Sequence, residues 1–378
     1  MNQWKKVKFL DYIKLNPSIK LNKGELYPFV EMSNAPTNAR TPDKIVYATY
    51  NGGGSKFEKN DTVIARIEPC LQNGKAFRCN VEKGFGSTEF LVFRPNNENI
   101  DSDYIYYFMH LEWIKDTMAA SMVGATGRQR VQNSIFNSLE FTLPTLHTQH
   151  RIASILSRYD SLIENYQHQI KLLEEAAQRL YKQWFVDLKF PGYENAVFVD
   201  GIPQGWEWKK VGDLVKKVQR TKQVPTNLYQ INGRIPVIDQ SRVFIAGYTD
   251  DIECEVDATI PYIVFGDHTR ILKYIPFNFA KGADGTQLIM SNDLQRMPQT
   301  LFFNSLINID LSNYSYARHF KYLKEEVVIV PSHPIAKHYD KIVVLFYNNI
   351  KNLQSQIRHL TEARDRLLPK LMNGEIEV

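Results

Sequence analysis

Apolar residues recur in alternating steps of four and three over residues 151–185. This spacing is typical of the seam of a coiled coil, which is narrower than the apolar stripe of an ordinary globular helix. A helix over 152–184 would be about 50 Å long at 1.5 Å per residue. The seam positions are Ile152, Leu156, Tyr159, Ile163, Tyr166, Ile170, Leu173, Ala177, Leu180 and Trp184.

The same pattern returns 187 positions later, so the partner of this helix is predicted to lie in the same chain. Polar residues match at the same offset, with Asn165 on Asn352 and Arg179 on Arg366, which apolar periodicity alone would not produce. Arg364 departs from the repeat because it stands where the first helix has Ala177. The second seam consists of Tyr339, Val343, Phe346, Ile350, Leu353, Ile357, Leu360, Arg364, Leu367 and Leu371.

The repeat also reaches the start of each half of the chain. Residues 4–7, Trp-Lys-Lys-Val, recur as residues 208–211. The stretches between these starts and the long helices differ in length and share little sequence. The chain is therefore predicted to alternate a variable domain and a long helix, twice.

Within the variable stretches the period changes to short β-branched and aromatic runs bounded by Gly, Asn and Pro. In the first stretch we expect strands at 44–50, 62–66 and 90–93 and a helix at about 101–120. In the second we expect strands at 235–238, 262–265 and 288–290. Each stretch is predicted to form a small α+β domain.

Composition limits the possible classes of protein. Apolar content of 43% and charged content of 23% are typical of a folded chain, and the net charge of +5 is compatible with nucleic acid without arguing for it. The three cysteines form no CxxC pair, so we expect a reducing compartment and no zinc site. The start of the chain does not resemble a signal peptide and no stretch is apolar enough to span a membrane, which favours a cytoplasmic protein.

The loop before each long helix contains the best candidates for nucleic-acid contact, because arginine binds guanine edges or phosphate and glutamine can pair with adenine. Alternatively, these arginines are solvated or pair with carboxylates. The candidates in the first loop are Thr126, Arg128, Gln129 and Arg130, and those in the second are Tyr316, Arg318 and His319. Weaker candidates near turns are Lys56, Lys75, Arg78, Arg270 and Lys281.

We find no catalytic constellation. Residues 52–56, Gly-Gly-Gly-Ser-Lys, do not have the order of a phosphate-binding loop, and the chain has no Pro-Pro run of the kind that amine methyltransferases need. Glu207 and Lys209 resemble part of a nuclease motif but belong to the repeated domain start. His268 and His319 have no spaced ligand partners, so no metal or cofactor is predicted.

Together these features resemble the specificity subunits of type I restriction–modification systems over essentially the whole chain. The second helix start, residues 330–333, departs from the first because it is shorter and lacks the glutamine. The residues that carry the resemblance are Leu143, Pro144, Gln149, Ile152 and Leu156, the run Ile-Pro-Gln-Gly-Trp at 202–206, the repeat itself, and the ending at 367–376.

The resemblance implies two α+β target recognition domains, at 1–143 and 191–329, each reading one half of a split double-stranded DNA site. It implies long helices at 144–190 and 330–378 that pack as an antiparallel coiled coil and dock two methyltransferase subunits. Restriction subunits then join the complex, so adenine methylation and ATP-dependent cleavage belong to partners. The unequal domains predict an asymmetric site. A rigid rod of about 50 Å would fix the gap between half-sites, and gaps in multiples of one DNA turn, about 34 Å, would keep both readers on one face. No homodimer is required.

Two alternatives follow from the same residues. The chain could serve as the specificity subunit of another multisubunit restriction system, or as a coiled-coil adaptor whose two domains bind proteins. A self-contained DNA methyltransferase is disfavoured because the motifs for its cofactor are missing.

Overall fold

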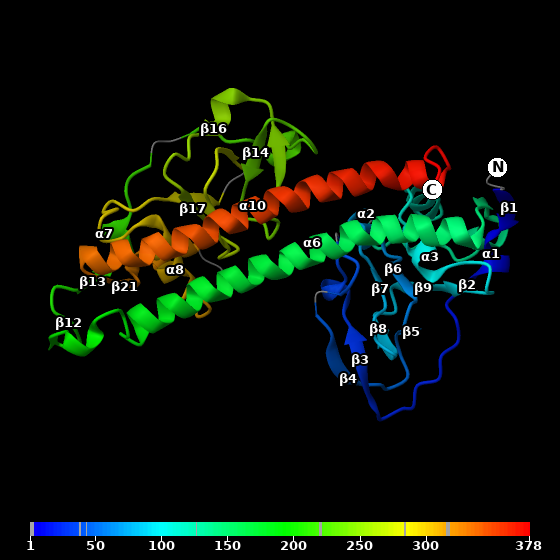
Figure 1. Cartoon of the computed structure of the whole chain (residues 1–378), viewed down its shortest axis with the longest axis horizontal. Coiled ribbons are helices and arrows are strands. Elements are labelled where there is room, and N and C mark those ends of the chain that lie inside the picture. The colour runs from blue at the N-terminus through cyan, green and yellow to red at the C-terminus, as the bar shows by residue number, and fades with distance from the viewer. Residues whose placement is uncertain are drawn as a thin grey trace. The chain divides into compact units, whose positions relative to one another are not determined.

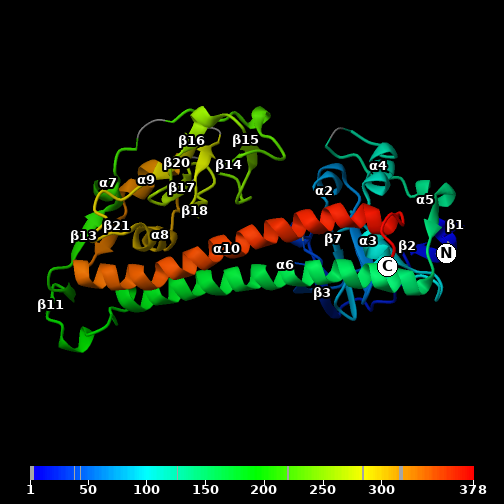
Figure 2. The same ribbon diagram turned by 45° about the horizontal axis from the view of Figure 1, so that its top comes forward.

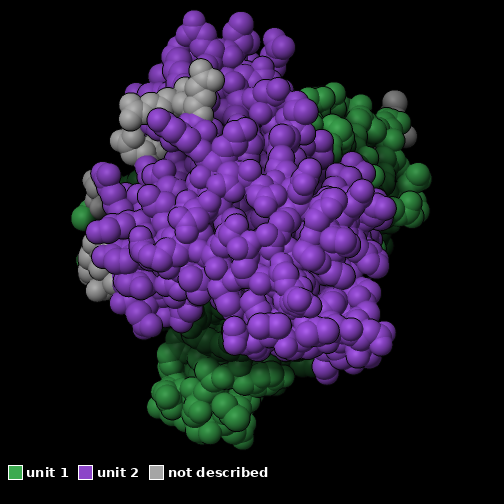
Figure 3. Space-filling view, turned by 90° about the vertical axis from the view of Figure 1, so that its left-hand side faces the viewer, with its two compact units in different colours: residues 1–168, 354–378 green, residues 169–353 purple. Residues whose placement is uncertain are grey.

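We analysed a computed structural model of the chain, which describes residues 4–37, 39–42, 44–125, 127–218, 221–282, 285–314 and 318–378. The chain divides into two compact units (Figures 1 and 3). Unit 1 comprises residues 1–168 and 354–378, and unit 2 comprises residues 169–353. Each unit therefore contains one stretch of each long helix, α6 (Leu146–Tyr181) and α10 (His333–Met372). In the part of the chain that is described, no helix has the length and apolar character needed to cross a membrane.

Unit 1 combines short strands with five small helices and a 3₁₀ turn before α6. These elements are β1 (Lys5–Lys8), α1 (Phe9–Tyr12), β2 (Ile13–Leu15), β3 (Leu26–Val30), the 3₁₀ turn Met32–Asn34, β4 (Val46–Thr49), β5 (Ser55–Glu58), β6 (Thr62–Ala65), α2 (Glu68–Gln72), β7 (Ala76–Arg78), β8 (Lys83–Gly86), β9 (Phe90–Pro95), α3 (Ser102–Phe108), α4 (Glu112–Ala120), α5 (Ile135–Ser138) and β10 (Glu140–Leu143).

In unit 2 a π-helical turn, Lys182–Val186, follows the first long helix. Further elements of this unit are the 3₁₀ turn Tyr193–Asn195, β11 (Phe198–Val199), β12 (Ile202–Pro203), β13 (Glu207–Lys210), α7 (Val211–Leu214), the 3₁₀ turn Thr226–Leu228, β14 (Ile235–Ile238), β15 (Gly247–Thr249), the 3₁₀ turn Ile252–Cys254, β16 (Glu255–Val256), β17 (Tyr262–Gly266), β18 (Leu272–Ile275), β19 (Phe279–Lys281), β20 (Thr286–Ile289), α8 (Gln299–Ile307), α9 (His319–Glu325) and β21 (Val327–Val330).

The two units have similar sheet plans although their variable sequences share little, and in unit 1 a fourth strand, β2, also pairs with β9. In unit 1, β6 pairs antiparallel with β7 and β9, and in unit 2, β17 pairs antiparallel with β18 and β20. A second sheet has the order β4-β3-β8-β5 in unit 1 and β15-β14-β19-β16 in unit 2, and its two central strands are parallel in both. The α+β class predicted from the sequence is confirmed.

The expected strands are present as β4, β6, β9, β14, β17 and β20. The helix expected at 101–120 is instead two helices, α3 and α4, so that expectation was wrong in one respect. The chain turns at His110, whose N–H donates to the carbonyl of Tyr107, and Leu111 is extended at ψ 138° and buried. A buried residue in a turn gives no periodic signal that separates it from a continuous helix.

The match of residues 4–7 with 208–211 is out of register by two residues. Lys5 pairs with Leu143 in unit 1, whereas Glu207 pairs with Val330 in unit 2, and Leu143 and Val330 are 187 positions apart. The structural counterpart of Trp4 is therefore Trp206. Trp206 is buried beside Phe185 and Phe190, whereas Trp208 is 57% exposed. The sequence match of residues 4–7 with 208–211 therefore paired Trp4 with the exposed Trp208 by coincidence.

Every predicted seam residue of α6 and α10 is buried or half-buried, including Arg364, which is 16% exposed. The buried stripe is wider than a seam, because Asp160, Tyr181 and Tyr347 are buried as well. These additional residues face the globular part of their own unit. In unit 1 the beginning of α6 and the end of α10 run side by side in opposite directions (Figure 2), and Leu156 and Leu371 share one hydrophobic core.

Candidate nucleic-acid interface

The loop before α6 forms a closed hairpin in unit 1. The Val123 N–H donates to the Arg130 carbonyl at 3.1 Å, and the Arg130 N–H donates to the Val123 carbonyl at 3.0 Å. Between them the Arg128 N–H donates to the Ala125 carbonyl at 2.9 Å, which turns the chain. Thr126 lies outside the described residues. Because its ends are paired, the loop presents its side chains from a fixed backbone.

Two carboxylates hold this loop and distinguish its two arginines. Glu68 accepts a hydrogen bond from the Gly127 N–H at 2.9 Å, and Glu89 accepts both Nε and Nη2 of Arg130 at 2.8–2.9 Å. The hydrogen bond that Arg130 donates to Glu89 raises the pKa of Arg130. Arg128 is exposed, and the described residues give its side chain no hydrogen bond or ion pair. Gln129 is half-buried, and its amide donates to the Gly124 carbonyl at 3.4 Å.

The weaker candidates of unit 1 are bound to their own domain. Lys56 donates to the Ile19 carbonyl at 3.2 Å and lies over the Tyr50 ring, and Lys75 donates to the Met32 carbonyl at 2.6 Å. Arg78 forms an ion pair with Asp103 and is 17% exposed. The structure therefore gives Lys75 and Arg78 supporting roles, because their charged groups already bind internal acceptors.

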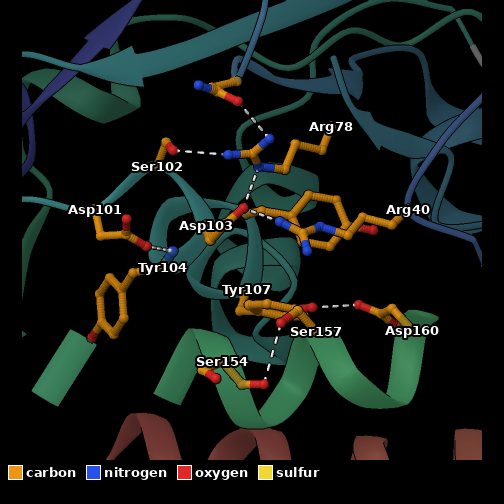
Figure 4. A network of polar contacts seen from close by, with 12 residues as sticks. Arg40, Arg78, Asp101, Ser102, Asp103, Tyr104, Tyr107, Ser154, Ser157 and Asp160 are labelled. Carbon is orange, nitrogen blue, oxygen red and sulfur yellow. Dashed lines mark hydrogen bonds and ion pairs between the residues drawn. The ribbon is translucent and has the colours of Figure 1, made fainter. Parts of the chain in front are cut away.

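A polar network that sequence reasoning missed joins the first domain to α6 (Figure 4). Arg40 and Arg78 both pair with Asp103 on α3. Burial, and then the neighbouring Arg40, lower the pKa of Arg78 to about 10. Glu164 of α6 accepts the backbone N–H groups of both Arg40 and Thr41 at 3.0 Å. This network fixes the loop at 40–41 between α3 and the long helix.

The start of α6 is tied to the same domain by Gln149, which is fully buried. Its amide donates to the carbonyls of Asn99 and Pro144 and accepts the Asp101 N–H at 2.9 Å. The repeat places Ala336 at this position in α10, where it is also fully buried. The two helix starts are therefore held by different chemistry, in agreement with the departure noted at 330–333.

Comparison with known proteins points to one family. Residues 2–175 match the family model for the type I restriction modification DNA specificity domain. The type I restriction enzyme MjaIX specificity subunit of Methanocaldococcus jannaschii is 27% identical over 310 residues, which cover 74% of this chain and 70% of the relative. The HindI specificity subunit of Haemophilus influenzae is 24% identical over 414 residues, covering 84% of this chain and 87% of the relative.

The chain is similar to the specificity subunits of type I restriction–modification systems. Its fold is similar to that of the crystallised S subunit from M. genitalium, with a TM-score of 0.58 and 16% identity over 98% of this chain and 96% of that one. The matched family model describes a DNA specificity domain, and both relatives are specificity subunits of restriction enzymes.

In unit 2 several of the candidate residues surround the turn after β17. Arg270 is exposed at φ 62°, and its Nη1 donates to the Leu311 carbonyl at 2.9 Å. His319 is 4% exposed, and its two ring nitrogens lie 2.8 Å and 2.9 Å from the carbonyl oxygens of Asp267 and Tyr314. His319 is thus internal. Lys281 is half-buried and has its own interactions, Arg318 is exposed, and Tyr316 lies outside the described residues.

The turn at 267–270 also presents residues that we had not selected from the sequence. His268 and Thr269 are exposed at its tip. Gln240 fixes them from a distant loop, because it accepts the His268 N–H at 3.1 Å through its side chain and the Thr269 hydroxyl at 2.6 Å through its carbonyl. No local motif marks Gln240. Among the missed residues only Asp101, which caps α3 through the Tyr104 N–H, had a sequence signal as an N-cap.

Unit 1 contains a cavity of about 520 Å³ beside α4 and the end of α10, lined by Tyr106, His110, Lys115 and Asp365 among others. Burial lowers the pKa of His110 to about 4, and its Nδ1 donates to the Tyr106 carbonyl at 2.7 Å. His110 is therefore neutral near pH 7. Over the described ranges no three His, Cys, Asp or Glu side chains come together as a possible metal site.

Proposed function

We propose that this chain reads a bipartite, asymmetric site in double-stranded DNA, with one half-site for each variable domain. We assign the reading domains to residues 1–143 and 191–329 and the helical spacer to residues 144–190 and 330–378. The observation that carries the proposal is the shared sheet plan of the two units, which present loops of different sequence at the same place. One plan with unlike loops is what two readers of unlike half-sites require.

Within this proposal the candidate side chains at the surface have two roles. Arg128, Gln129 and Arg130 of the first loop, and Arg270 and Arg318 of unit 2, are placed to reach base edges or phosphates. Lys56 and Lys281 would add salt-dependent attraction to the backbone, and Thr126 and Tyr316 belong to the same two loops. Lys75, Arg78 and His319 support these surfaces from inside.

We further propose that the chain docks two methyltransferase subunits through its long helices and recruits restriction subunits through the assembled complex. The side chains of α6 and α10 that point away from both the seam and the domains would form the docking surface. We place this activity in the cytoplasm because its DNA substrate lies there. The chain itself would need no cofactor, since both reactions belong to its partners.

The test is to map adenine methylation by single-molecule sequencing in a host that expresses this chain with its neighbouring methyltransferase. A two-part, asymmetric methylated motif that disappears on deletion of this gene is the expected result. Methylation that persists unchanged without this chain would remove it as the reader and favour a protein-binding adaptor.

A further inference from the structure

The loops before the two long helices occupy the same position in the two sheets, as their backbone hydrogen bonds show. After β6 the Arg66 N–H donates to Glu89 and the Val131 N–H donates to the Arg66 carbonyl. After β17 the Asp267 N–H donates to Gly285 and the His319 N–H donates to the Asp267 carbonyl. Val131 and His319 are therefore structural counterparts. The residue before each is an arginine, Arg130 in unit 1 and Arg318 in unit 2.

The residue that faces the arginine differs between the units. The same hydrogen bonds make Glu89 the counterpart of Gly285. Glu89 binds the Arg130 guanidinium through Nε and Nη2, whereas Gly285 has no side chain to offer Arg318. The glycine is required, because a Cβ there would lie 2.5 Å from Gln240 Nε2 and the backbone has φ +85°. One arginine is thus braced by a carboxylate, and the other is exposed without that brace.

We propose that Glu89 is a positioning residue that makes Arg130 a base-reading arginine of the first half-site, while Arg318 binds the DNA phosphate backbone of the second. This inference rests on the proposed function. Glu89 holds the guanidinium edge made by Nε and Nη2, and Nη1 also donates to the Arg128 carbonyl at 3.5 Å. Nη1 and Nη2 each keep a second N–H, and the edge that these two nitrogens form is directed away from the carboxylate. That outer edge is the one that can bind guanine O6 and N7 together.

Bracing matters because a free arginine side chain loses much rotamer entropy when it is held against one base edge. The Arg130 side chain is 46% exposed although it is paired with Glu89. Arg318 is exposed, and within the described ranges no carboxylate binds its side chain, so it can follow the phosphate backbone in several rotamers and would discriminate little between bases. The two halves of the site would therefore depend differently on these equivalent arginines.

The experiment compares Glu89→Gln, Arg130→Ala and Arg318→Ala in the full complex with its methyltransferase. We would map adenine methylation in cells and measure DNA binding against salt concentration. Glu89→Gln and Arg130→Ala should relax the same position of the first half-site, with discrimination there falling by about tenfold or more. Arg318→Ala should leave the motif unchanged, weaken binding to all sequences and reduce the salt slope by about one.

Glu82→Gln is the matched control, because Glu82 forms an exposed ion pair with Lys59 in the same unit. It should leave both the motif and the binding unchanged, and all variants should keep the thermal midpoint of the wild type. An intact motif in Glu89→Gln, or an altered second half-site in Arg318→Ala, would overturn the inference while the wild-type motif still stood. A wild-type complex without a two-part motif would overturn the proposed function, and this inference with it.

Discussion

Arg364 of α10 forms an ion pair with the buried Asp160 of α6, with Nη1 2.7 Å from Oδ1. The Tyr107 hydroxyl donates to the other oxygen of Asp160 at 2.5 Å. The repeat places Ala177 and Tyr347 at the corresponding positions of unit 2, where the Tyr347 hydroxyl donates to Asn304 at 3.0 Å. The same junction between helix and domain is therefore ionic in unit 1 and neutral in unit 2. Arg364, which departs from the repeat in the predicted seam, is thus explained by its ion pair with Asp160 on the other helix.

Replacing Arg364 by alanine should destabilise unit 1. The variant leaves the Asp160 carboxylate buried without its cation, which costs about 3–5 kcal/mol in comparable buried pairs. Burial alone would lower the pKa of Arg364, but Asp160 raises it above the ordinary value, so the pair is strongly coupled. Calorimetry should show a lower thermal midpoint. The double variant Asp160→Asn/Arg364→Ala removes the orphaned charge and should recover much of the loss, and a loss below about 1 kcal/mol in the single variant would contradict this.

His110 should make the stability of unit 1 depend on pH between about 6.5 and 4. Its pKa is lowered to about 4 in the folded chain, chiefly by burial and then by Lys115, against about 6.5 when unfolded. In that window the unfolded chain binds more protons, so the free energy of unfolding falls as the pH falls, by ~3 kcal/mol at most. Denaturant titrations of the wild type and His110→Asn should diverge in this window, and parallel pH profiles would refute the assignment.

Arg128→Ala should relax recognition in one half-site only, because Arg128 is exposed on a loop whose backbone is fixed by Glu68. The loss of one bidentate contact corresponds to about 1–3 kcal/mol of discrimination. Methylation mapping would detect the new sites. Arg128→Lys keeps the charge but loses the planar fork, so it should behave like alanine if Arg128 reads a base. Retention of the motif in the lysine variant, with equal weakening on all DNA in the alanine variant, would make Arg128 a phosphate contact.

Ile170→Asp should destabilise unit 2, because Ile170 is half-buried against the hydrophobic core that also contains Tyr339 and Val343. Burying a carboxylate there should cost about 2 kcal/mol or more. Leu172→Asp is the matched control, since Leu172 lies on the same helix but is 49% exposed. Thermal unfolding should separate the two variants. Equal midpoints for both would argue against the predicted helix pairing.

The sequence predicted those elements whose signal is local or periodic. The long helices followed from steps of four and three, and the strands from short β-branched runs between turn residues. The sequence repeat misaligned the start of the second domain by two residues, because four identical residues at 208–211 suggested one alignment. The correct alignment follows only from the pairing of β1 with β10 and of β13 with β21. The loop arginines were found as candidates, but their unequal partners were not, because Glu89 lies 41 residues from Arg130.

By itself, the sequence determined that this protein has two variable α+β domains, each followed by a long helix, and that the two helices are copies of one internal repeat. It also contained no catalytic motif that we recognise. Periodicity carries this information because residues one structural period apart in a helix or strand lie on the same face, which is either buried or exposed. Only the tertiary structure decided which candidate side chains remain exposed. Arg78 and His319 are held by internal acceptors, whereas Arg128 is exposed and its side chain has no hydrogen bond or ion pair with the described residues. The physical reason is that a charge is satisfied by whichever group the fold places within about 3 Å, and chain separation does not limit that choice.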